Sequence, residues 1–323
     1  MNNFTRYLNL FFNDYLTLQL NCSNNTIVSY KDTFRLLLKY LMNEKEIKIK
    51  DIDFKVLNKN NIKDFLNYIE DQKKCSVNTR NQRLAAIKSF FQFVGIENIE
   101  YLNEVQDILN IRMKKTIKKE NSYLTTNELE EMYNNMPKET KKERRNYVLL
   151  VLLYDSAARL SEILNVKVGD LKLDAEPSIT LLGKGRKERC VPIMNKTKDL
   201  LGMYIEENKL ASSSYLFSNS KKEKINSRTI QLMISKYNTT NKKITPHSFR
   251  RSRAIHLLEA GVDIIYIRDL LNHSSITTTE RYAKASVEYK RKMIEKTYSN
   301  AFKSGEETSW NQDKELLEEL INL

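Results

Sequence analysis

The chain's 323 residues include only three histidines, and two of them stand beside groups that could handle a phosphate. His247 and Arg250 lie three positions apart in TPHSFRRSRAIHLLEA, which has helical periodicity, so both project from one side of a helix. His273 ends the run DLLNH, and Tyr282 follows in the next helical stretch. Upstream, Arg159 follows an apolar helix. Guanidinium, imidazole and phenol groups can bind an anion, move a proton and attack as a nucleophile.

Each of these residues also has an ordinary interpretation. Arg159 would suit a plain surface position, and Lys184 in GKGRK a generic basic turn. His247 and Arg250 would suit the start of a helix, and His273 a cation near a helix C-terminus. His256, inside the apolar run AIHLLEA, is predicted to be packed or at the surface rather than catalytic. The joint pattern, and not any single residue, carries the functional argument.

Six residues in a fixed order resemble the catalytic signature of the tyrosine recombinases, the phage-integrase and Xer-like family: Arg159, Lys184, His247, Arg250, His273 and Tyr282. The matching stretches are SAARLSEILNV, LLGKGRKERCVPI and TPHSFRRSRAIHLLEAGVDIIYIRDLLNHSSITTTERY. NTIVSYKDTFRLLLKYL and SVNTRNQRLAAIKSFFQFV resemble the family's core-binding domain. The chain departs from the family pattern at Ala158, where a Gly commonly precedes the first Arg, at Arg251 and at Asn272. These departures concern backbone detail and remove no functional group.

The resemblance implies that Tyr282 attacks a DNA phosphodiester, leaving a 3′-phosphotyrosyl link and a free 5′-hydroxyl, with His247 as general base. Arg159 and Arg250 can each direct two N–H groups at non-bridging oxygens. Lys184, on its Gly-flanked turn, can protonate the leaving oxygen, while His273 contacts the phosphate or orients the nucleophile. The link keeps the ester's energy, so we expect no ATP and no other cofactor. No acidic cluster has metal-ligand spacing, so we also expect no metal. Glu162, one turn after Arg159, is predicted to hold that arginine or a backbone amide.

Composition favours a polyanionic partner. With 54 Lys+Arg against 41 Asp+Glu the formal charge is +13, which suits double-stranded DNA, although a Lys-rich surface alone would also produce it. No stretch approaches the roughly 18 apolar residues of a membrane span, and the start lacks the features of a secretory signal. Three well-separated cysteines indicate reduced thiols and a cytoplasmic location.

The fold class is predicted to be mainly α with a small β-sheet. Residues 1–111 form a helical core-type DNA-binding domain, 112–121 a basic interdomain linker, and 122–300 an α+β catalytic domain. Residues 301–323 form an acidic amphipathic helix. Within these regions we expect one helix to start near Thr26, another to end at Gly95, and two strands to flank Gly183–Gly185.

DNA contacts are predicted in two places. The polar side of the helix over 76–94 offers four side chains for the major groove: Asn78, Thr79, Arg80 and Arg83. The linker offers four lysines for the phosphates: Lys114, Lys115, Lys118 and Lys119. A solvated helix face and a solvated linker are the plain alternatives.

The assembly expected from the resemblance is a tetramer on DNA that works through a Holliday junction. The acidic tail cannot be stable alone, so it docks on a neighbouring protomer or folds back on its own domain. Two other functions remain open: a type IB topoisomerase-like enzyme that relaxes DNA, and an accessory DNA-binding protein without catalysis. The sequence leaves integration, excision, transposition and dimer resolution equally open.

Overall fold

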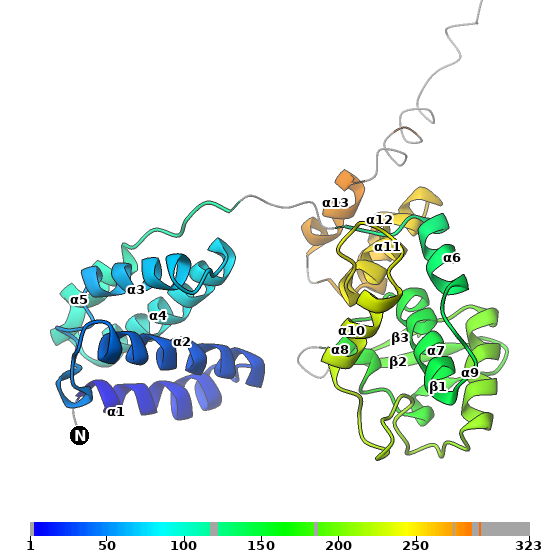
Figure 1. Cartoon of the computed structure of the whole chain (residues 1–323), viewed down its shortest axis with the longest axis horizontal. Helices are drawn as coiled ribbons and strands as arrows, with labels where there is room; N and C mark the ends of the chain where they lie inside the picture. Colours follow the sequence, from blue (N-terminus) through cyan, green and yellow to red (C-terminus); the bar gives the residue numbers. More distant parts are fainter. Residues whose placement is uncertain (1–2, 117–121, 184–186, 274, 286–290, 292–323) are drawn as a thin grey trace, which may run out of the picture. The chain divides into compact units, whose positions relative to one another are not determined.

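The protein is described here from a computed structural model that covers residues 3–116, 122–183, 187–273, 275–285 and 291. Its contacts divide the chain into two compact units, residues 1–119 and 120–323 (Figure 1). Lys118, Lys119, Lys184 and the predicted tail helix over 301–323 lie outside the described residues.

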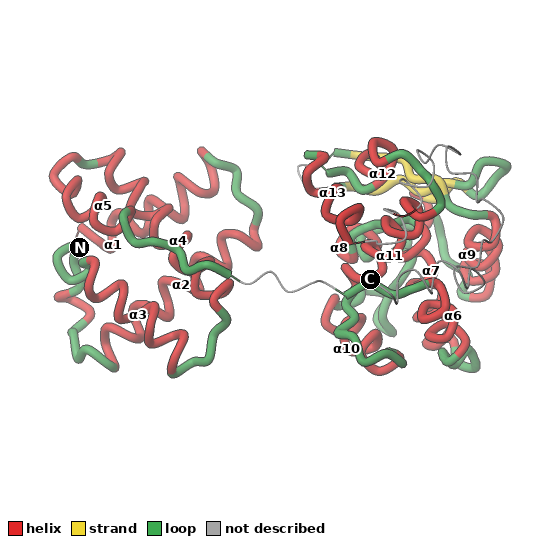
Figure 2. The backbone as a smooth tube through the Cα atoms, turned by 90° about the horizontal axis from the view of Figure 1, so that it is seen from above, coloured by secondary structure: helices red, strands yellow, loops and turns green. Residues whose placement is uncertain are grey.

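In the described part of the first unit the regular elements are all helices, joined by loops, as Figure 2 shows. Its elements are α1 (Asn3–Leu10), the π-helical η1 (Phe11–Gln19), α2 (Asn24–Asn43), η2 (Ile49–Asp51), α3 (Lys59–Asp71), α4 (Val77–Glu97), η3 (Ile99–Tyr101) and α5 (Leu102–Leu109). Phenylalanines from several of these helices meet edge to face in the core, among them Phe11, Phe34 and Phe90. Burying these rings supplies most of the driving force for the bundle.

Helix α4 shows how the sequence sets its own start. The Ser76 side chain accepts a hydrogen bond from the Thr79 backbone amide at 3.2 Å, which satisfies one of the free N–H groups of the first turn. Leu84, Ile87 and Phe91 are completely buried along its inner face.

Two predicted helix ends in this unit are wrong. Helix α2 begins at Asn24 with Ser23 as its N-cap, earlier than the expected start near Thr26. Helix α4 continues through Gly95 to Glu97. A Cβ at Gly95 would lie 3.2 Å from a methyl group of Val105, so the glycine lets α5 approach α4 closely rather than ending the helix.

The second unit combines helices with one small sheet. Its elements are α6 (Thr126–Asn134), α7 (Lys141–Asp155), α8 (Leu160–Ile163), η4 (Val168–Asp170), β1 (Leu171–Lys172), β2 (Ser178–Leu182), β3 (Glu188–Pro192), α9 (Asn195–Glu207), α10 (Ser227–Tyr237), α11 (Pro246–Glu259), α12 (Ile264–Leu270) and α13 (Ile276–Ala285). The predicted class, mainly α with a small sheet, is confirmed.

The sheet is antiparallel, in the order β1-β2-β3. The two predicted strands, β2 and β3, pair with Ile179 opposite Val191 and Leu181 opposite Arg189. Ile179, Leu181 and Val191 are buried and join the core that also contains residues of α7, α9 and α11. The third strand, β1, has only two residues and offers no alternation that a sequence pattern could detect.

None of the helices in the described ranges is long and apolar enough to cross a membrane.

Candidate active site and DNA-facing surface

Three of the predicted catalytic side chains line one cavity of the second unit. Arg159, His247 and Arg250 share a cleft of about 470 Å³ with residues from the start of α10, among them Ser227 and Gln231. Arg159 comes from the N-cap of α8, and the other two come from the first turns of α11. Ser227 and Gln231 are polar lining residues that sequence reasoning missed, since no motif marks them.

The start of α11 sets the spacing of His247 and Arg250. Pro246 occupies the first turn, where its missing N–H costs nothing, and Ser248 Oγ accepts a hydrogen bond from the Thr245 amide at 3.1 Å. His247 is exposed. Arg250, nearly one turn further, is only 1% exposed.

Arg250 joins two turns of the chain. Its guanidinium donates hydrogen bonds to the carbonyl of Ala157 at 2.8 Å and to the carbonyl of Leu271. Its Nε is buried without a hydrogen-bond partner in the described part of the chain. Burial, with the neighbouring charge of Arg159, lowers the pKa of Arg250 to about 10, so the group remains a cation at neutral pH.

Both turns contain a residue with left-handed backbone geometry. Ala157 has a φ of 48°, and Asn272 also has a φ of 48°. Ala158 is the residue that the sequence comparison placed at the family's glycine, and the left-handed residue of this turn is Ala157, one position earlier. Asn272 stands in place of glycine without disruption, because asparagine visits this region more readily than most residues.

Glu162 organises the basic side of the cleft. It is 4% exposed, and its oxygens accept hydrogen bonds from the backbone amide of Arg159 at 2.8 Å and from Arg159 Nη1 at 2.9 Å. Glu162 therefore holds both the Arg159 side chain and a backbone amide, the two roles predicted for it as alternatives. Arg189 on β3, which sequence reasoning missed, contacts the same carboxylate at 2.8 and 3.1 Å. Burial alone would raise the pKa of Glu162, but the hydrogen bonds from Arg189 and Arg159 outweigh it and lower the pKa to about 2.

His273 and Tyr282 lie against each other. Their ring centroids are 6.1 Å apart with an interplanar angle of 26°, and His273 Nδ1 is 2.9 Å from Thr279 Oγ1. Tyr282 is 5% exposed and packs among apolar residues of α11 and α12, including Ile255 and Ile267. The guanidinium of Arg251 lies 5.9 Å from the Tyr282 ring centroid, within cation–π range.

The pKa values of His273 and His247 are both lowered. Desolvation, followed by the positive charges of Arg250 and Arg159, lowers the pKa of His273 to about 4. Desolvation and neighbouring arginines, Arg250 first, also lower the pKa of His247. A neutral imidazole can accept a proton at pH 7, which a general base must do.

The β2–β3 turn starts beside Asn272, the residue before His273. The Gly183 amide donates to the Lys187 carbonyl at 2.9 Å. A Cβ at Gly183 would lie 3.1 Å from Asn272 Nδ2, next to His273 in the sequence. Lys184 itself falls on residues 184–186, outside the described residues.

The predicted groove-facing residues of α4 divide into two groups. Asn78 is exposed, while Thr79 and Arg83 are half-buried, with Arg83 Nη1 3.4 Å from Thr33 Oγ1. The expectation that Arg80 lies on the exposed side is wrong. Arg80 is 5% exposed and its Nε lies 3.4 Å from a carboxylate oxygen of Glu70, so it ties α4 to α3.

The two described lysines of the linker, Lys114 and Lys115, differ in their contacts with the first unit. Lys114 is held to the first unit, because Asn81 brackets its backbone through two hydrogen bonds and its Nζ pairs with Glu70 at 2.8 Å. Lys115 is exposed.

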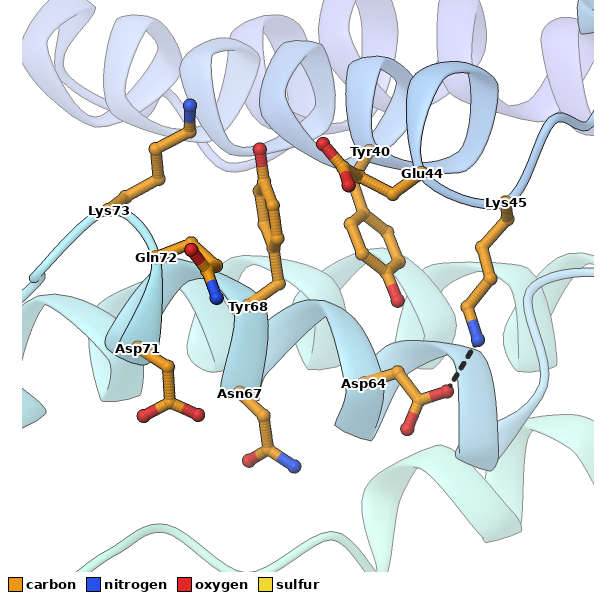
Figure 3. A pocket seen from close by; sticks show the side chains of 9 residues that line it. All are labelled: Tyr40, Glu44, Lys45, Asp64, Asn67, Tyr68, Asp71, Gln72 and Lys73. Carbon is orange, nitrogen blue, oxygen red and sulfur yellow. Dashed lines mark hydrogen bonds and ion pairs between the residues drawn. The ribbon is translucent and has the colours of Figure 1, made fainter.

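A second cavity, of about 670 Å³, lies between α2 and α3 (Figure 3). Tyr40 from α2 and Tyr68 from α3 face each other there with ring centroids 5.0 Å apart. Its rim carries three carboxylates, Glu44, Asp64 and Asp71, against two lysines, Lys45 and Lys73, so its net charge does not favour a phosphate backbone. Within the described residues, no cluster of three His, Cys, Asp or Glu side chains could hold a metal ion.

Comparison with known families matches both units. The family described as "Phage integrase family" matches residues 122–288. The domain described as "Phage integrase, N-terminal SAM-like domain" matches residues 9–98.

Individual relatives agree over nearly the whole chain. A putative integrase/recombinase, y4rC, from Sinorhizobium fredii is 31% identical over 98% of this chain and 97% of its own length. A tyrosine recombinase from Pseudothermotoga lettingae is 30% identical over 84% of this chain and 91% of its own length.

The fold has solved counterparts. The structure of a lambda integrase tetramer bound to a Holliday junction matches with a TM-score of 0.66 and 15% identity, covering 86% of this chain and 76% of that one. The family matches over both units, together with relatives at 30% identity or more, settle the family. The chain belongs to the phage integrase family, the tyrosine-type site-specific DNA recombinases.

Proposed function

We propose that this recombinase cuts and rejoins double-stranded DNA by making Tyr282 the nucleophile. The observation that carries the proposal is the linkage of the basic cleft to the His273–Tyr282 pair through Arg250, whose guanidinium hydrogen-bonds the turns on both sides. A phosphate that enters the cleft beside Arg250 is therefore near the one tyrosine of the recombinase signature.

The charges and protonation states of the cleft suit phosphoryl transfer. The Tyr282 oxygen forms a bond to phosphorus while the bond to the 5′ oxygen breaks, giving a 3′-phosphotyrosyl link. His247 takes the phenol proton, and Lys184 gives a proton to the departing oxygen. Arg159 is 41% exposed, and the Nε of Arg250 has no hydrogen-bond partner among the described residues. These two groups neutralise the charge that develops on the non-bridging oxygens. His273 donates a hydrogen bond to the phosphate from the nitrogen that does not face Thr279.

Binding to double-stranded DNA would use both units. In the first, Asn78, Thr79 and Arg83 reach the major groove, whereas buried Arg80 holds the helix in place. Lys114, Lys115, Lys118 and Lys119 of the 112–121 linker follow the phosphates. The net charge of +13 supports a large, salt-dependent share of the affinity.

Recombination requires several protomers, and we propose a tetramer on DNA with a Holliday-junction intermediate. The likeness of the fold to a lambda integrase that was solved as a tetramer on such a junction supports this assembly. The acidic segment 301–323 would dock on a neighbouring protomer. Deleting residues 306–323 should weaken tetramer formation on DNA, and unchanged assembly would contradict the docking role.

We place the protein in the cytoplasm, in keeping with its unpaired cysteines.

The function is tested in two stages. First, fragments of genomic DNA are selected for binding and the bound site is mapped by footprinting. A nicked synthetic duplex carrying that site should then form a covalent protein–DNA adduct, and the Tyr282→Phe variant, which lacks only the hydroxyl, should form none. Relaxation of supercoiled plasmid without strand exchange would favour a topoisomerase. Site binding with no adduct from the wild type would favour a non-catalytic DNA-binding protein.

A further inference from the structure

Arg189 is a buried cation to which the mechanism above gives no role. It lies on β3 opposite Leu181, on the same side of the strand as the buried Val191, and its side chain is 11% exposed. Its two terminal nitrogens each contact a different oxygen of Glu162, Nη1 to Oε1 at 3.1 Å and Nη2 to Oε2 at 2.8 Å. Such a two-pronged contact fixes the plane of the carboxylate as well as its position.

Each carboxylate oxygen of Glu162 accepts one hydrogen bond from Arg159 and one from Arg189. Oε1 accepts from Arg159 Nη1 and from Arg189 Nη1, and Oε2 accepts from the Arg159 amide and from Arg189 Nη2. The carboxylate is almost fully buried, so water cannot replace a lost donor without rearrangement. The direction of the Arg159 guanidinium therefore depends on a carboxylate whose other contacts come from Arg189.

The same side chain adjoins the β2–β3 turn. A Cβ at Gly183 would lie 3.7 Å from Arg189 Nη1. Gly183 is the last described residue before Lys184, and its amide closes the turn on the Lys187 carbonyl. Through Arg189 the hairpin stem is thus bound to α8, the helix whose N-cap is Arg159.

We propose that Arg189 is a positioning residue for DNA cleavage: it aims Arg159 through Glu162 and holds the stem of the β2–β3 hairpin against α8. The inference rests on the proposed function and deepens it. Arg189 acts through other groups, without touching the reacting phosphate or the nucleophile.

Three full-length variants test this role. Arg189→Lys keeps the charge but cannot contact both carboxylate oxygens in a fork, and Arg189→Met removes the charge from a chain of similar length. Arg144→Met is the matched control, because it breaks another Arg–Glu pair of the same unit, Arg144 with Glu207, whose residues do not line the cleft. The measurement is the single-turnover rate of adduct formation on the duplex selected above, with DNA affinity and Tm recorded for each protein.

A displaced guanidinium slows chemistry more than it weakens binding. We expect Arg189→Lys to slow adduct formation about 10-fold and Arg189→Met about 100-fold, with DNA affinity changed less than about 3-fold. Arg144→Met should react at the wild-type rate. If Arg189→Met lowers Tm too far to be assayed, Arg189→Lys decides the question.

A double-mutant cycle separates positioning from general stabilisation. Because Arg189 acts through Arg159, Arg189→Met should slow an Arg159→Lys protein less than about 3-fold.

The outcomes distinguish this inference from the function on which it rests. A wild type that forms no Tyr282-dependent adduct overturns both. A wild type that reacts, beside an Arg189→Met variant with the same rate, overturns only the positioning role. Equal slowing by Arg189→Met in the wild-type and Arg159→Lys backgrounds also overturns it.

Discussion

Arg250 donates a hydrogen bond to the carbonyl of Ala157 at 2.8 Å, joining α11 to the turn that leads into Arg159. A second bond from the same guanidinium reaches the carbonyl of Leu271, just before Asn272 and His273. One buried side chain therefore holds the two turns from which the cleft arginine and the histidine–tyrosine pair extend. Stability and chemistry are coupled at this residue.

Replacing each of the two cleft arginines by lysine should have very different effects on stability. Arg250→Lys leaves an ammonium that cannot reach both carbonyls. We therefore expect the free energy of unfolding to fall by roughly 3 kcal/mol and adduct formation to be lost. Arg159→Lys, at a half-exposed position, should slow adduct formation strongly, to a rate that can still be measured, while changing stability by less than about 1 kcal/mol. Urea denaturation and the adduct assay check both. Equal destabilisation by the two changes would contradict the structural role of Arg250.

The left-handed turn at Asn272 predicts a graded series. Asn272→Gly should retain stability and adduct formation, because glycine adopts a φ of 48° without strain. Asn272→Val should lose about 2 kcal/mol and displace His273, because a β-branched residue is strongly disfavoured there. Thermal denaturation and the adduct rate of both variants check the series. A valine variant as stable as the glycine variant would show that this backbone geometry is wrong.

The buried carboxylate predicts an acid-sensitive component of stability. The pKa of Glu162 is about 2 in the folded protein and near 4.5 when unfolded, so the unfolded state binds more protons between these values. The stabilisation, roughly 3 kcal/mol, is complete above about pH 5 and is lost as the pH falls toward 2.

Urea unfolding of the wild type and Glu162→Gln across pH 2–7 measures this component. The wild type should lose more stability than the variant between pH 5 and pH 2, because the amide does not titrate. Parallel curves would mean that Glu162 is not ionised between its two arginines.

Two polar residues of α4 should separate folding from DNA binding. Arg80→Met breaks the buried contact with Glu70 and should cost about 2 kcal/mol of stability. Asn78→Ala, at an exposed position, should leave stability within about 0.5 kcal/mol and weaken binding to the selected site. Denaturation and a binding titration distinguish the two. A stable Arg80→Met protein with weakened DNA binding would restore Arg80 to the groove-facing group.

The sequence by itself predicted the family, through an ordered set of candidate catalytic residues, and it showed many local structural signals. Ser76 and Asp263 act as N-caps, Pro246 opens α11, and Gly261 follows its end with a positive φ, each in a local pattern of neighbouring residues. Such features depend on contacts within a few positions, which a sequence displays directly.

Tertiary structure alone decided which polar residues are buried and what they contact. Arg80 and Asn78 belong to the same helix start, but only Arg80 meets a carboxylate on α3. Gly95 resembles a helix end, yet its bare backbone accommodates Val105 from α5. Arg189 lies between ordinary strand residues until folding brings it to Glu162, 27 positions earlier in the chain. Each outcome depends on a partner distant in sequence, and the periodicity of one segment holds no information about that partner.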